Sequence, residues 1–104
     1  MQIEYKFRHI QHSQELTDYV ADRITKLEKF ELKPARAEFT FSSEKECKRV
    51  DLHVHSADVE MHATTEADDY FTAVDVVLEK MARQLSRKKA KLQAHKAVKP
   101  SKVS

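Results

Sequence analysis

Basic side chains recur at helical spacing near the C-terminal end of the chain. Successive separations of three, four and four residues place four of them on one face of an α-helix: Lys80, Arg83, Arg87 and Lys91. Lys88 and Lys89 widen this face; the first four residues together with Lys88 are called the basic stripe below. Because such a row of cations can lie along a phosphate backbone, the spacing predicts binding to a nucleic acid. A solvated polar face is the alternative interpretation.

The division of charge along the chain supports the first interpretation. From Lys80 to Ser104 there are nine Lys or Arg residues and no Asp or Glu, whereas residues 1–79 carry a net charge of −7. Since no acidic residue follows Glu79, ion pairs within the helix account for little of the stripe. An acidic body would also repel a polyanion elsewhere, which restricts docking to the basic face.

A second, weaker basic ridge precedes the middle of the chain. Arg23, Lys26 and Lys29 follow one another at intervals of three residues, beside the apolar face of a predicted helix. Asp22 and Glu28 lie next to them in the sequence and could neutralise the ridge. We therefore include these three cations as candidate nucleic-acid contacts that depend on how the two helices pack.

Three histidines raise the question of a metal site. His53, His55 and His62 are expected on the solvent face of the sheet, but the chain has no HExxH or paired-cysteine motif. The expected strand pairing places Asp51 opposite His62 and Glu60 opposite His53, so that ordinary cross-strand polar pairs account for the imidazoles. We expect no metal, no cofactor and no catalytic residue, and hence no enzyme.

Composition excludes several further classes. The chain has no glycine, which removes phosphate-binding loops and dinucleotide fingerprints. Its one cysteine, Cys47, cannot form an internal disulfide, which suits a reducing cytosol. There is no apolar run of membrane-spanning length and no signal peptide at the start. These features predict a cytoplasmic protein with neither a membrane nor a small-molecule substrate as its partner.

Apolar periodicity predicts the elements that position these residues. Alternation of polar and apolar residues indicates four strands, at 2–8, 36–42, 49–55 and 58–64. One helix is expected from an N-cap at Ser13 to about Phe30, and a long one from a cap at Thr65 or Asp68 to about Leu92. The long helix has an apolar face of Phe71, Val74, Leu78, Met81 and Leu85.

This order, β-α-β-β-β-α, predicts an α+β fold in which a four-stranded mixed sheet carries two helices on one face. The first two strands should be parallel through a right-handed crossover, and the rest should form an antiparallel meander. In the last hairpin we expect three pairs: Val54 with Val59, Leu52 with Met61 and Val50 with Ala63. Residues 1–93 would form the domain, and 94–104 a basic disordered tail.

Several segments resemble one known family. The segment from Asp68 to Asp75, Asp-Asp-Tyr-Phe-Thr-Ala-Val-Asp, is similar to that family's acidic-aromatic helix start, and Lys80-Met81-Ala82-Arg83-Gln84-Leu85 to its Lys-Leu-x-Arg-Gln-Leu segment. Tyr19-Val20-x-x-Arg23 and Lys26-Leu27-Glu28-Lys29-Phe30 resemble its first helix. The family is that of the ribosome hibernation promoting factors, also called ribosome-associated inhibitors or sigma-54 modulation proteins, and the resemblance covers about residues 2–92.

The resemblance implies a fold like that of double-stranded RNA-binding domains. It further implies binding to ribosomal RNA in the decoding channel of the small ribosomal subunit, where the protein blocks messenger and transfer RNA and silences translation in stationary or stressed cells. By motif, the implied RNA contacts are Arg23, Lys26, Lys29, Lys80, Arg83, Arg87, Lys88 and Lys91.

The length and the basic ending resemble the family's short hibernation-promoting type, because long members carry an added dimerisation domain and another short type ends in an acidic tail. We expect a monomer away from the ribosome. Three alternatives remain open: a generic double-stranded RNA-binding module, a protein-interaction modulator of transcription, and a small metal-dependent enzyme that uses the histidines. Co-sedimentation with ribosomes would favour a ribosome-binding protein over these three alternatives.

Overall fold

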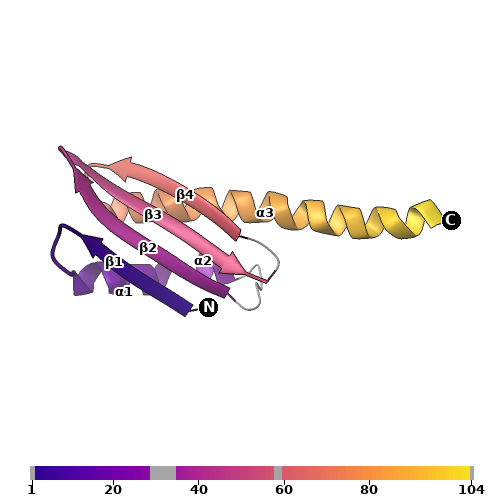
Figure 1. The fold of residues 1–104 in the computed structure, drawn as a ribbon, viewed down its shortest axis with the longest axis horizontal. Coiled ribbons are helices and arrows are strands. Elements are labelled where there is room, and N and C mark those ends of the chain that lie inside the picture. The colour runs from indigo at the N-terminus through magenta and orange to yellow at the C-terminus, as the bar shows by residue number, and fades with distance from the viewer. Residues whose placement is uncertain (1, 29–34, 58–59, 104) are drawn as a thin grey trace.

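The computed structural model describes residues 2–28, 35–57 and 60–103, with side chains up to Lys88 in the last helix. Its elements follow one another in the order β1 (Gln2–Arg8), α1 (Gln14–Arg23), α2 (Thr25–Glu28), β2 (Ala35–Glu44), β3 (Cys47–Ser56), β4 (Glu60–Ala67) and α3 (Tyr70–Val103). Figure 1 shows the helices on one side of the sheet and the C-terminal part of α3 extending beyond it. Within the described part of the chain, no helix is both long enough and apolar enough to cross a membrane.

The sheet has the predicted topology. Its strand order is β1-β2-β3-β4, with β1 parallel to β2 and both later pairs antiparallel. The alternating strand pattern gives the sheet one apolar and one polar face, and the helices cover the apolar one. The predicted α+β fold is therefore confirmed.

The core lies between this apolar face and the helices. Its fully buried side chains include Phe39, Phe41, Leu52, Leu78 and Met81, which come from β2, β3 and α3. Burial of apolar surface of this kind is the main favourable term in folding. Phe71 is the exception on the predicted apolar face of α3, because it is 36% exposed and packs at the edge, against Tyr19.

The first predicted helix is divided in the structure. Ser13 caps it as expected, since its hydroxyl oxygen accepts a hydrogen bond from the amide of Leu16 at 3.3 Å. Instead of continuing, α1 ends at Arg23, and the amide of Leu27 bonds the carbonyl of Ile24 at 2.9 Å, only three residues back. This tighter turn separates α2 from α1 while both keep their apolar side toward the core. The predicted end at Phe30 lies outside the described residues.

The last hairpin is shifted by two residues from the predicted pairing. Val54 pairs with Met61, Leu52 with Ala63 and Val50 with Thr65. All three predicted pairs are therefore wrong, including that of Val54 with Val59, a residue that lies outside the described part of the chain. A two-residue shift keeps every side chain on the same face, so hydrophobic alternation does not distinguish between the two registers.

β4 extends to Ala67, three residues past its predicted end, and α3 therefore begins later than expected, at Tyr70. Thr65 is not a helix cap but a buried strand residue, and Asp68 is not the cap either. The cap is Asp69, whose carboxylate accepts hydrogen bonds from the amide and the hydroxyl of Thr72 at 2.8 and 2.9 Å. These bonds hold the pKa of Asp69 below its ordinary value.

The far end of α3 also differs from the expectation. The helix continues through Val103, past Leu92, where the apolar periodicity ends. The division into a domain of residues 1–93 and a tail of 94–104 stays a prediction.

Candidate nucleic-acid interface

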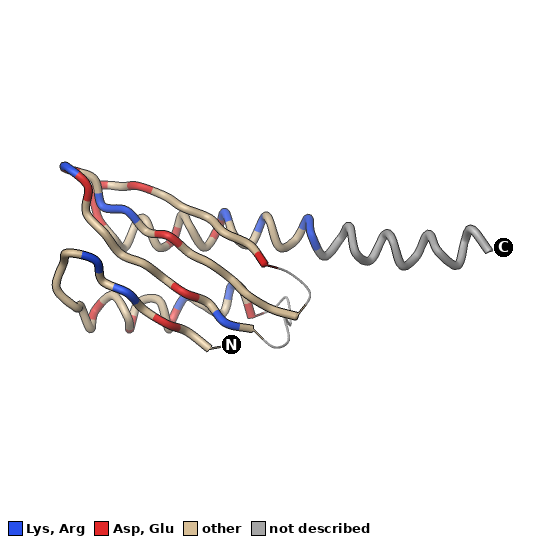
Figure 2. The backbone as a smooth tube through the Cα atoms, in the orientation of Figure 1, with Lys and Arg blue, Asp and Glu red and all other residues tan. Residues whose placement is uncertain are grey.

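The described part of the basic stripe is exposed along α3. Lys80, Arg83, Arg87 and Lys88 all face solvent, while Met81 and Leu85 between them are fully buried. Figure 2 shows Lys and Arg recurring along the described part of this helix. Because the buried side fixes the helix on the sheet, the cations are held in a row without needing partners of their own. The side chain of Lys91 lies outside the described residues.

Among the residues that the structure describes, the stripe makes almost no internal ion pairs. Lys80 donates a hydrogen bond to the backbone carbonyl of Thr64 at 3.0 Å, and none of the described carboxylates pairs with its charge. Arg83 lies 4.0 Å from the carboxylate of Glu79, with both side chains more than half exposed, so that this pair is weak. For Arg87 and Lys88 the structure shows no ion pair among the residues that it describes. Their charges are available to an external anion.

Arg23 differs from the other candidate contacts. Its Nε lies 3.1 Å from Oδ1 of Asp75, its Nη1 lies 3.2 Å from Asp22, and its guanidinium stacks 4.3 Å from the ring centre of Tyr19. The interaction with the Tyr19 hydroxyl group, together with the two carboxylates, raises the pKa of Arg23. This residue therefore already has internal partners, of which the sequence indicates only Asp22.

The rest of the first ridge is less fully described. Lys26 is exposed on α2, which packs against α3, so that it belongs to the same helical layer as the stripe. Lys29 lies outside the described residues. The sequence did not predict that Tyr19 and Asp75 are partners of Arg23. No local pattern links Asp75 to residues that lie more than fifty positions before it.

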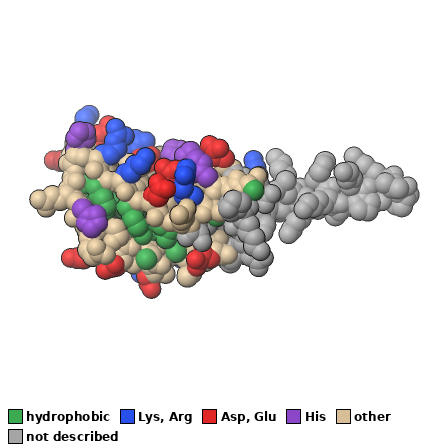
Figure 3. Space-filling model, turned by 60° about the horizontal axis from the view of Figure 1, so that its bottom comes forward, with side chains coloured by type: hydrophobic (Ala, Val, Ile, Leu, Met, Phe, Trp, Pro, Cys, Tyr) green, Lys and Arg blue, Asp and Glu red, His purple; other side chains and the backbone are tan. Residues whose placement is uncertain are grey.

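The opposite face of the sheet carries mixed charges. Glu38 is central to it, with ion pairs to Lys6 at 3.6 Å, Arg36 at 3.1 Å and His55 at 2.9 Å. Partial burial by itself would raise the pKa of Glu38, but the nearby cations outweigh it and hold that pKa below its ordinary value. Figure 3 shows basic, acidic and histidine side chains gathered next to one another. Such mutual neutralisation makes this face a poorer polyanion site than α3.

The histidines of this face are not paired as predicted. Asp51 pairs with Thr64, and His53 with His62, in the observed register. The expected partners still meet diagonally, because His62 lies 3.5 Å from Asp51 and His53 lies 3.3 Å from Glu60. Ligand atoms of His53, His55 and Glu60 all lie within 4.8 Å of one another, so these residues could hold a metal. The direct cross-strand pairing on which the expectation of no metal rested is therefore not observed.

Comparison with known proteins identifies relatives over most of the chain. The model of the family described as sigma 54 modulation protein/S30EA ribosomal protein matches residues 3–93. The ribosome hibernation promoting factor of Klebsiella oxytoca is 30% identical over 95 residues, which cover 91% of this chain and 100% of that protein. The factor of the same name from Pseudomonas putida strain KT2440 is 28% identical over 90% of this chain and 92% of that protein.

Two solved structures have the same fold. A ribosomal subunit interface protein from Coxiella burnetii aligns with a TM-score of 0.73 and 26% identity, over 86% of this chain and 99% of that one. The N-terminal domain of Thermus thermophilus Protein Y aligns with a TM-score of 0.76 and 19% identity, over 84% of this chain and 98% of that domain. The family match over residues 3–93 includes every candidate contact, from Arg23 to Lys91.

Proposed function

The chain belongs to the sigma 54 modulation protein/S30EA ribosomal protein family, and on this basis we propose that it is a ribosome hibernation factor. It binds ribosomal RNA in the decoding channel of the small ribosomal subunit, blocks messenger and transfer RNA there, and silences translation in stationary or stressed cells. Curated relatives that bear the name ribosome hibernation promoting factor support the first step of this proposal.

The exposed basic stripe on α3 is the observation that carries the RNA contact. Arg83, Arg87 and Lys88 project from a helix whose other side is buried, so that binding a phosphate backbone does not require the fold to rearrange. The proposed contact set also includes Lys80, Lys91, Lys26, Lys29 and Arg23.

The position of the aromatic side chains favours recognition of shape over recognition of single-stranded bases. Phe39 and Phe41 are fully buried, and Tyr5 and Phe7 of β1 pack against the core. Stacking platforms for single-stranded bases need exposed rings on the open sheet face. The protein therefore reads phosphate positions and the shape of folded RNA.

The same proposal assigns the protein a binding role without catalysis. It acts in the cytoplasm, uses neither a cofactor nor a small-molecule substrate, and is a monomer away from the ribosome.

Competition on purified small subunits tests the proposal directly. The full chain is sedimented with small subunits, large subunits or a free RNA duplex of matched phosphate concentration, and then challenged with messenger RNA and initiator transfer RNA. We expect selective binding to small subunits and mutual exclusion with both RNAs. Equal affinity for the free duplex would instead identify a generic double-stranded RNA-binding module, and simultaneous binding with both RNAs would rule out the decoding channel.

A further inference from the structure

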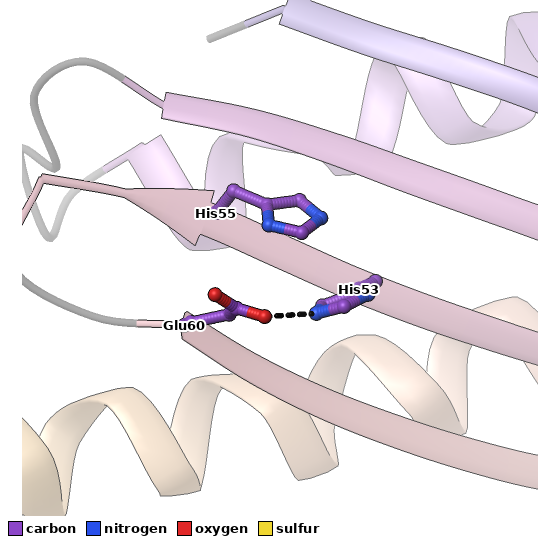
Figure 4. A group of neighbouring side chains, drawn as sticks. All are labelled: His53, His55 and Glu60. Carbon is purple, nitrogen blue, oxygen red and sulfur yellow. Dashed lines mark ion pairs between the residues drawn. The ribbon is translucent and has the colours of Figure 1, made fainter.

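Two histidines and a glutamate gather on the open face of the sheet, away from the helices. His53 and His55 alternate along β3, and Glu60 is the first residue of β4. The imidazole rings lie 3.9 Å apart between centroids at an angle of 35°, and Nε2 of His53 lies 3.3 Å from Oε1 of Glu60. Figure 4 shows all three side chains converging on the space between the two strands. The hairpin register produces this cluster by pairing His55 with Glu60.

Two imidazoles and a carboxylate form a ligand set that zinc and related divalent metals accept. Ligand atoms of the three residues lie within 4.8 Å of one another. With metal–ligand bonds of about 2.0–2.1 Å, tetrahedral ligand atoms are separated by roughly 3.4 Å, so that only small side-chain rotations are needed. Glu60 is 69% exposed and has room for that adjustment.

His55 also has a carboxylate on its far side. Its Nε2 is buried and lies 2.9 Å from Oε2 of Glu38, an ion-pair contact not aligned as a hydrogen bond. In Figure 4 the other ring nitrogen of His55 is on the side of Glu60. A histidine that ligates a metal commonly directs its second nitrogen to a carboxylate, which fixes the ring and makes it a stronger ligand. Lys6 and Arg36 hold Glu38 in turn.

We propose that His53, His55 and Glu60 bind one divalent transition-metal ion of the zinc class, with water in the remaining coordination positions. His62 is the nearest further imidazole, with its ring centroid 5.8 Å from that of His53, but Asp51 lies 3.5 Å from its Nε2. The site therefore has three protein ligands and stays open to solvent. A bound ion would fasten the start of β4 to β3 beside their connection.

Calorimetric titration of the full chain with zinc chloride tests this site. The protein is purified without a polyhistidine tag and carries Cys47→Ser, because the exposed thiol of Cys47 is another potential zinc ligand. We expect saturable binding of one zinc ion per chain. The double variant His53→Gln, His55→Gln should lose this binding, and Glu38→Gln should weaken it by about 10- to 100-fold.

A matched control and a spectroscopic measurement make the outcome decisive. His9→Asn removes an exposed histidine away from the cluster and keeps a residue type that tolerates its φ of 62°; its zinc affinity should be unchanged. Circular dichroism confirms that each variant is folded, and Cu²⁺ bound in place of zinc should show nitrogen hyperfine coupling that disappears in the double variant. Less than one bound zinc ion at saturation, or a folded double variant that binds as the parent does, would overturn the proposal.

Discussion

Nε of Arg23 lies 3.1 Å from Oδ1 of Asp75, and this contact joins α1 to α3 across the helical layer. The other oxygen of Asp75 accepts a hydrogen bond of 2.6 Å from the hydroxyl group of Tyr19. Both bonds link residues more than fifty positions apart in the sequence. Arg23, a candidate RNA contact by motif, is therefore also part of the packing between the helices.

This double role predicts that Arg23→Gln and Arg87→Gln have different effects. Loss of Arg23 should lower the free energy of unfolding, because Asp75 loses its cation. It should weaken ribosome binding less than loss of Arg87 does, because Asp75 and Asp22 already pair with the Arg23 charge. Loss of Arg87, which has no ion pair in the described structure, should weaken binding and leave stability within about 0.5 kcal/mol of the parent. Urea unfolding and subunit binding, measured on both variants, check this. A larger loss of binding for Arg23→Gln than for Arg87→Gln would contradict it.

Charge reversal in the basic stripe should abolish binding without unfolding the protein. In Arg83→Glu with Arg87→Glu, two phosphate contacts become two repulsions, and we expect affinity for small subunits to fall by orders of magnitude. The only described ion pair lost is the weak 4.0 Å contact with Glu79. Sedimentation at physiological salt measures the binding, and far-UV circular dichroism checks the fold.

The salt dependence of binding gives a quantitative form of the same test. Neutralising Arg83 and Arg87 to Gln should flatten the slope of log K against log salt by roughly 1.4 to 1.8 units, since each phosphate contact contributes about 0.7 to 0.9. Lys6→Gln with Arg36→Gln is the matched control, because it removes the same charge from the open sheet face, where Glu38 pairs with both residues. Equal slopes for the two double variants would mean that the stripe is only a solvated face.

Acid should destabilise the protein through Asp51, among other carboxylates. Partial burial would raise the pKa of Asp51, but two hydrogen bonds from Arg49, at 3.1 and 3.2 Å, and one from Thr64 outweigh it and lower that pKa. A carboxyl group with a lowered pKa stabilises the fold above the unfolded value, about 3.9, and loses that contribution as the pH falls through the folded value. The urea midpoint of the parent protein should therefore drop below about pH 4. Asp51→Asn should lower the midpoint at pH 7, and its midpoint should fall less between pH 7 and acid pH than that of the parent. An unaltered pH profile in Asp51→Asn would contradict this role.

Truncation of Leu52 should be among the costly substitutions in the sheet. Its side chain is fully buried between the sheet and the helices, so we expect Leu52→Ala to lower the free energy of unfolding by about 2–5 kcal/mol. Glu66→Ala, at an exposed position of β4, is the comparison and should stay within about 0.5 kcal/mol. Chemical unfolding monitored by circular dichroism measures both. Similar losses for the two variants would show that the core is not organised around β3.

Local patterns were sufficient to predict the elements and their buried sides. Alternation along the strands and the four- and three-residue spacing of Leu16, Val20, Ile24 and Leu27 depend only on neighbouring positions, and these residues are indeed buried. The exposed stripe was predictable for the same reason, because the position of Arg83 and Arg87 on the helix follows from the buried positions of Met81 and Leu85. The parallel pairing of β1 with β2 followed from chain connectivity.

Other features depend on contacts between distant segments. The shift that places Val50 opposite Thr65 keeps both apolar faces intact, so hydrophobic patterning left the register open, and packing in three dimensions selected it. That register brings Glu60 to His53 and His55, and it moves the helix cap from Thr65 or Asp68 to Asp69. With exceptions such as Phe71 and Thr65, the sequence alone determined which side chains face solvent and which face the core. Only the tertiary structure decided which of the exposed charges, such as Arg23, are held by an internal partner, because those partners come from other elements of the fold.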